Sequence, residues 1–165
     1  MADKSSFTPE EWKVVLSSPM LAGLAVTLAE PSGLWGMLKE SMASARALLT
    51  AATDPSASAL EKAVLADMET SQGRGIARDE LKADLTGKSP AELKQAVIAK
   101  LAEVSKILDA KAPGDAPGFK TWLKHVAEQV AEAASEGGTL GFGGVKVSDA
   151  EKATLAEVGK ALNVA

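Results

Sequence analysis

The sequence predicts an all-α protein, a single domain over residues 1–165 built as a bundle of about seven or eight helices. Hydrophobic residues make up 46% of the chain and charged residues 24%, an ordinary globular mixture rich in alanine, the strongest helix former. Aromatic residues are only 4%, tyrosine is absent and β-branched residues never form a long run, so no substantial sheet is expected. A minor strand near Val145 and Val147 is the one sheet element that the pattern allows.

A capping box predicts where the first helix begins. In the segment FTPEEW at residues 7–12, Thr8 is placed to cap the helix, Pro9 takes the first helical position, and Glu11 reaches back as the capping-box partner. Phe7 and Trp12 have the spacing of a hydrophobic staple across this start.

A serine–proline pair is expected to divide the apolar stretch that follows. Because the residue before a proline is disfavoured in the helical conformation, Ser18 and Pro19 are expected to end the first helix and to start another over residues 20–29. This second helix is nearly all apolar, and a helix without a polar face is normally surrounded by protein. The whole stretch falls short of the ~20 apolar residues that a spanning helix needs, so no transmembrane segment is predicted.

The rest of the chain reads as further helices joined by glycine and proline turns. Two more capping boxes, Ser89 with Glu92 and Ser148 with Glu151, predict the starts of a long helix and of the last helix. A linker is predicted at residues 113–118. The other predicted helices are residues 34–50, a helix capped by Asp54 and Pro55 that runs past Met68, a short helix at 76–85 after an interruption at 72–75, and a helix from Phe119 to near Glu136.

Composition disfavours several classes of protein. The formal net charge is −4 and no basic stripe is present, which argues against nucleic-acid binding. Because the chain contains no cysteine, disulfides, thiolate metal sites and thiol nucleophiles are excluded, and a reducing compartment fits. The first residues lack the apolar core of a signal peptide, so a cytoplasmic location is expected.

The lone histidine is the natural place to look for acid–base or metal chemistry. A helical projection puts His125 beside Thr121, Glu128 and Glu132, on or near the polar face of its helix, so a solvated surface histidine is expected. A di-iron site needs a repeated Glu-x-x-His motif, and a serine hydrolase of the common type has a Gly-x-Ser-x-Gly elbow. The chain has neither, so no catalytic residue, metal site or cofactor is predicted, and the sequence leans away from an enzyme.

The glycine-rich segment at residues 137–144 is the most unusual stretch. A phosphate-binding loop would follow a strand, whereas a helix precedes this segment, so nucleotide binding is disfavoured. The favoured interpretation is a structural connection in which Leu140 and Phe142 are buried in the core. The alternative is a loop that contacts a partner or ligand through Gly138, Gly141, Phe142, Gly143 and Gly144.

Three tryptophans offer large apolar side chains with one hydrogen-bond donor each. Core packing is expected for Trp12 and Trp122. Trp35 lies off the main apolar face of its predicted helix, which makes it the best candidate for a groove or an oligomer contact. Residues 73–78 carry two arginines flanked by acidic residues, which favours a solvated loop with local ion pairs over an anion site.

Segments near the two ends of the chain carry a resemblance. They are FTPEEW at residues 7–12 with AEPSG at 29–33, and EGGTLGFGGVKVS at 136–148. In these segments the chain resembles a group of small bacterial soluble proteins of uncharacterised function. The resemblance implies a bacterial soluble protein and implies no activity, cofactor or catalytic residue.

The sequence therefore favours a non-catalytic helical protein that acts through protein contacts and forms a homo-oligomer, because alanine-rich helices supply flat packing surfaces. The alternative is a small-molecule binding protein or an unrecognised enzyme with a pocket between helices, near Trp35 and the glycine-rich segment. A third reading is attachment to a membrane surface through residues 20–37.

Overall fold

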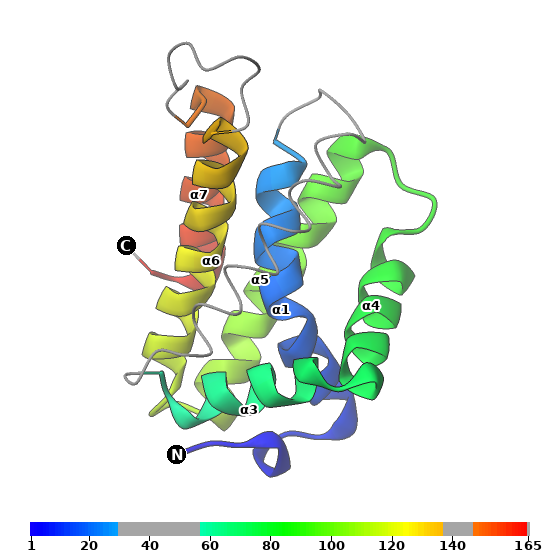
Figure 1. Ribbon diagram of the computed structural model, residues 1–165, viewed down its shortest axis with the longest axis vertical. Coiled ribbons are helices and arrows are strands. Elements are labelled where there is room, and N and C mark those ends of the chain that lie inside the picture. Colours follow the sequence, from blue (N-terminus) through cyan, green and yellow to red (C-terminus); the bar gives the residue numbers. More distant parts are fainter. Residues whose placement is uncertain (30–56, 137–146, 165) are drawn as a thin grey trace.

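The computed structural model describes residues 1–29, 57–136 and 147–164. Within these ranges it contains one short 3₁₀ helix, six α-helices and no strand (Figure 1). The elements are η1 (Lys4–Ser6), α1 (Pro9–Thr27), α3 (Ala59–Glu69), α4 (Ser71–Leu85), α5 (Pro90–Lys111), α6 (Ala116–Glu136) and α7 (Asp149–Leu162). The predicted all-α class is confirmed for these residues. The helix predicted at residues 34–50 and Val145 of the predicted strand lie outside the described ranges, and Val147, which is described, belongs to no strand.

The predicted break at Ser18 and Pro19 is wrong, because α1 continues through both residues and counts as one helix where two were expected. Proline has no N–H, so the Val15 carbonyl loses its usual partner four residues later. The Ser18 hydroxyl donates to that carbonyl at 2.6 Å and supplies the missing hydrogen bond. A side-chain donor next to the proline therefore lets the helix continue through a buried site.

Replacing Ser18 by alanine should lower the free energy of unfolding by about 1 to 3 kcal/mol, because the buried Val15 carbonyl would lose its donor. Ser17→Ala is the matched control. Its hydroxyl donates to the Val14 carbonyl at 3.0 Å, but that carbonyl is also within reach of the backbone N–H of Ser18. Urea denaturation of both variants tests this account, and equal losses would contradict it.

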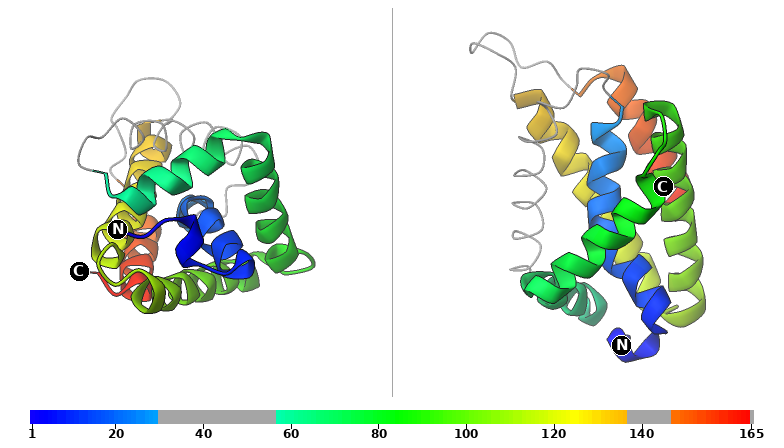
Figure 2. Two further views of the ribbon diagram at one scale, coloured as in Figure 1. Left: turned by 90° about the horizontal axis from the view of Figure 1, so that it is seen from below. Right: turned by 90° about the vertical axis from the view of Figure 1, so that its right-hand side faces the viewer.

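The apolar helix α1 lies at the centre of the described bundle, as its composition predicts. The helices α4, α5, α6 and α7 all contact it, and α3 crosses near its N-terminal end. Figure 2 shows this enclosure from below, with α1 in blue inside the other helices. No helix in the described ranges is both long and apolar enough to span a membrane. The buried apolar residues of α1 are Trp12, Val14, Val15, Leu16, Leu21, Ala22, Ala25 and Val26.

Three helices begin at the capping boxes that the sequence predicts. The boxes that begin α1, α5 and α7 are all present, and Ser148 accepts from the Glu151 N–H while Glu151 accepts from the Ser148 N–H. Helix α6 begins at Ala116, so the predicted linker at residues 113–118 is too long. Pro117 is compatible with this start because it lies in the first helical turn, where no backbone donor is needed. The fully buried residues of these helices include Val97, Leu101, Leu108, Phe119, Leu123 and Leu162.

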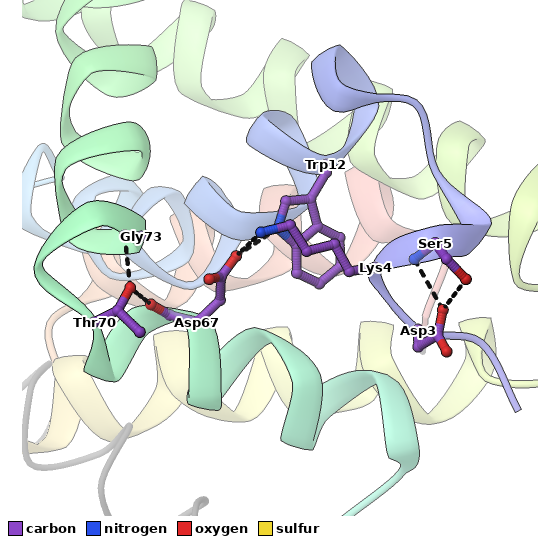
Figure 3. Close-up of polar contacts among 7 residues, drawn as sticks. All are labelled: Asp3, Lys4, Ser5, Trp12, Asp67, Thr70 and Gly73. Carbon is purple, nitrogen blue, oxygen red and sulfur yellow. Dashed lines mark hydrogen bonds and ion pairs between the residues drawn. The ribbon is translucent and has the colours of Figure 1, made fainter.

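The break between α3 and α4 lies at Thr70, so the predicted interruption at residues 72–75 is wrong. The Thr70 hydroxyl accepts from the Gly73 N–H at 2.8 Å and donates to the Asp67 carbonyl at 2.7 Å, which caps α4 and ends α3 (Figure 3). The Arg74 guanidinium donates to the Met68 and Glu69 carbonyls at the end of α3. Residues 73–78 are therefore helical, and Arg74 serves as a helix cap.

Candidate functional site

The residues that the sequence singles out for contact with a partner or ligand all fall outside the described ranges. The structure therefore neither brings them together nor separates them, and the burial of Phe142 stays a prediction. The residues are Trp35, Gly138, Gly141, Phe142, Gly143 and Gly144.

The histidine lies on the solvent side of α6, as predicted. The side chain of His125 is 64% exposed, and its Nδ1 atom lies 3.4 Å from a Glu128 carboxylate oxygen one turn away. Within the residues that the structure describes, no three His, Asp or Glu side chains gather as a metal ion would require.

Two side chains from distant parts of the sequence donate to one carboxylate, that of Asp67. The indole Nε1 of Trp12 donates to Asp67 Oδ2 at 2.7 Å, and the ammonium of Lys4 donates to the same oxygen at 2.8 Å. Figure 3 shows the two donors meeting Asp67 from different elements, with Thr70 on its other side. The Lys4 nitrogen also lies 5.8 Å from the Trp12 ring centroid. One oxygen atom thus joins η1, α1 and the end of α3.

The electrostatics of this carboxylate suit a structural role. Partial burial raises the pKa of Asp67, but the hydrogen bonds from Lys4 and Trp12, together with the Lys4 charge, outweigh it and hold the pKa below its ordinary value of 3.8. A carboxylate with a lowered pKa and two donors on one oxygen is a weak general base. Its chemistry is to hold three elements together.

The stability that Asp67 provides should depend on pH. Because its pKa is lower in the folded protein than in the unfolded chain, its contribution is fully present above about pH 4 and is lost as the pH falls through the folded-state value. Asp67→Asn should cost about 1 kcal/mol at pH 7, and its difference from the wild type should shrink below about pH 4. Urea denaturation at several pH values measures both, with the exposed Asp79→Asn as the control. A constant gap across pH would contradict the assignment.

A second carboxylate holds the beginning of the chain at the turn between α5 and α6. The backbone N–H of Ala2 donates to Asp115 Oδ2 at 2.7 Å, and Ala2 is buried. Asp67 and Asp115 therefore both bind residues 1–6, which we call the N-terminal strap.

Other polar pairs join neighbouring helices. The buried Lys120 of α6 donates to both carboxylate oxygens of Asp109 in α5, at 2.7 Å each. The Ser105 hydroxyl donates to the Leu162 carbonyl at 3.2 Å and connects α5 to the end of α7.

Two of the tryptophans are buried, as expected, but only one has an acceptor for its N–H. Trp12 donates to Asp67, whereas no described residue accepts from the buried Nε1 of Trp122. Trp122 packs edge to face against Phe119, with ring centroids 5.0 Å apart. Its indole N–H is the one buried side-chain donor in the described ranges with no partner there.

The two tryptophans should respond differently to the same substitution. Trp12→Phe removes a hydrogen bond to a charged group, whereas Trp122→Phe removes an unpaired donor together with the same ring area. Trp12→Phe should therefore lower the free energy of unfolding by about 1.5 to 3 kcal/mol more than Trp122→Phe. Equal losses in urea denaturation at pH 7 would show that the Asp67 contact adds nothing.

Sequence reasoning missed Asp67, because Lys4 and Trp12 lie 63 and 55 residues away from it and no local pattern connects them. The unpaired position of the Trp122 donor was equally invisible in the sequence. In comparisons with known proteins, no family model, no curated protein and no solved structure matches the chain.

Proposed function

We propose that the protein is a non-catalytic helical module that acts through contacts with other proteins, including copies of itself. The observation that carries this proposal is that several polar side chains in the described residues are used to join one element to another. Asp67 links η1, α1 and α3, and Lys120 links α6 to α5. Lys94 of α5 pairs in the same way with Glu157 of α7 at 3.1 Å.

The described surface indicates what kind of contact to expect. Met1 is the only large apolar side chain that is exposed in the described ranges. A ready-made apolar interface is therefore not part of the proposal for these residues. Three kinds of contact are proposed instead. Exposed polar side chains can pair between copies, a segment can detach from its own bundle and bind another copy, or Trp35 and the glycine-rich segment can bind a partner.

Light scattering at several protein concentrations tests self-association. The mean mass should rise with concentration and fall again at high salt, because contacts made by exposed charges are screened. A mean mass that stays at the monomer value up to about millimolar protein would remove self-association from the proposal. Contacts between tethered segments typically act at this effective concentration.

A second candidate function, binding of a small molecule between helices, is favoured by the unpaired indole N–H of Trp122. A buried donor beside an aromatic ring is the kind of polar group that orients a ligand in an apolar pocket. A thermal-shift screen against nucleotides, acyl thioesters, metals and lipids tests it, since a tight ligand raises the melting temperature. The shift should disappear in Trp122→Phe, and a flat response across the panel would favour the interaction module.

The location and origin are proposed from the sequence. We propose a bacterial cytoplasmic protein that does not bind nucleic acid, on the basis of its cysteine-free composition, its charge and the resemblance described above. Cell fractionation tests the location, and recovery of the protein with membranes would favour attachment through residues 20–37 instead.

A further inference from the structure

The N-terminal strap, residues 1–6, is held to the rest of the bundle by few contacts. Ala2 is the only buried residue in it. Two hydrogen bonds join it to distant residues, from Lys4 to Asp67 at 2.8 Å and from the Ala2 N–H to Asp115 at 2.7 Å, and the terminal ammonium of Met1 lies 4.0 Å from Asp115. Both acceptors are carboxylates, so the attachment is mainly electrostatic and sensitive to salt. Release of the strap breaks these contacts and uncovers the side chain of Ala2.

The strap also has local structure of its own. Asp3 caps η1 by accepting from the Ser5 N–H at 2.8 Å and from the Ser5 hydroxyl at 2.6 Å, and its own N–H donates to the Ser6 hydroxyl. These bonds lie within residues 3–6 and do not depend on the bundle. The strap can therefore form the same local hydrogen bonds when it lies on a second copy.

The junction with α1 is built to stay in place. Phe7 is buried and packs against Trp12 with ring centroids 5.7 Å apart, so the staple holds the start of α1. The backbone at Phe7 is extended, with φ −118° and ψ 152°. A change of direction at this residue would redirect the strap without disturbing α1.

We propose that the strap of one copy binds Asp67 and Asp115 of a second copy, so that two copies exchange straps. This inference rests on the proposed self-association and names its surface. No large apolar side chain but Met1 is exposed in the described residues, so one route to association there is for an element to leave its place and pair with a second copy. The strap fits this role, since the exchanged contacts repeat those within one copy. A chain's own strap competes at an effective concentration of about millimolar, so exchange in the wild type is weak.

A mixture of two charge-reversed variants tests the exchange. In Lys4→Glu, the strap carries a negative charge at residue 4 and meets the negative Asp67. In Asp67→Lys, the positive Lys4 of the strap meets a positive residue 67. Each variant therefore repels its own strap. In an exchanged pair of the two variants, both straps meet a residue of opposite charge. The mixture should therefore associate at least about tenfold more tightly than either variant alone, as measured by analytical ultracentrifugation.

The double variant Lys4→Glu with Asp67→Lys is the matched control. It restores opposite charges within one copy and shares with Asp67→Lys the loss of the Trp12 acceptor, so it should be mainly monomeric at concentrations where the mixture associates. No gain in affinity in the mixture, with both single variants shown to be folded by circular dichroism, would overturn strap exchange. If the mixture shows no gain but the wild type associates, strap exchange is wrong and the proposed self-association stands. If the wild type does not associate at any concentration, the proposed self-association is wrong.

Cross-linking tests the same contact if Asp67→Lys does not fold. The chain contains no cysteine, so two exposed positions can carry the only thiols, Ser5→Cys in one copy and Ala66→Cys in the other. Exchange should give a Ser5–Ala66 product between isotopically distinct copies with a short bis-maleimide, at a yield that falls with salt. A chain that carries both cysteines is the control for the contact within one copy. If it forms the product and the mixture of single-cysteine copies does not, the proposal is overturned.

Discussion

Replacing Phe119 by alanine should lower the free energy of unfolding by about 3 to 5 kcal/mol, the cost of a large core cavity. The side chain is completely buried, and its ring meets Trp122 edge to face at an interplanar angle of 69°. It lies on the face of α6 that turns to the core, and α6 packs on α1. A loss of this size is a large fraction of the total stability of about 5 to 15 kcal/mol that is usual for one domain.

The control for Phe119 lies two residues along the same helix. Thr121 is exposed and donates only to the Pro117 carbonyl in the preceding turn, so Thr121→Ala should change the stability by no more than about 0.5 kcal/mol. Urea denaturation gives both values. A loss below about 1 kcal/mol for Phe119→Ala would mean that the site collapses around the missing ring, and would contradict the close packing of α6 on α1.

Gly73→Ala should lower the free energy of unfolding by about 1 to 3 kcal/mol, the usual cost of overpacking. A Cβ atom at residue 73 would overlap the backbone carbonyl of Asp67 and would lie 3.1 Å from the Thr70 hydroxyl. Backbone atoms cannot rotate away as a flexible side chain can. The substitution would therefore push α3 and α4 apart and disturb the carboxylate that binds Lys4 and Trp12.

Gly75→Ala, two residues later in α4, should have the opposite sign. Nothing lies within 4 Å of a Cβ atom there. Because alanine is a better helix former than glycine, this variant should be more stable by about 0.5 to 1 kcal/mol. Thermal and urea denaturation measure the stability of both variants. Changes of the same sign in the free energy of unfolding would contradict the close approach of the Asp67 carbonyl to residue 73.

The three helix starts that were predicted from capping boxes are confirmed, because a capping box is local. Thr8 with Glu11 and Ser148 with Glu151 need only residues three apart in the sequence, and the structure contains both. The long helix α5 also begins directly after the Ser89 of its predicted capping box. Signals that depend on one short segment can be read without knowing the rest of the fold.

The errors arose where a nearby side chain changes the effect of a helix breaker. Pro19 read as a break, but the Ser18 hydroxyl satisfies the carbonyl that the proline leaves. The glycines at residues 73 and 75 also read as a break, but Thr70 ends α3 and caps a helix that includes them. The contacts of Asp67 could not be predicted, because they form only when distant segments meet.

The central position of α1 has a consequence for synthesis of the chain. The helix is complete at Thr27, but the helices that cover it begin at Ser71 and end at Leu162. At roughly 5 to 20 residues per second, the ribosome needs about 4 to 17 s to travel from the end of α1 to the end of α5. Throughout that interval α1, the most apolar helix of the described residues, lacks α6, α7 and a complete α5. Nascent chains stalled before α5 should therefore bind chaperones that recognise exposed apolar segments, and chains released after α7 should not.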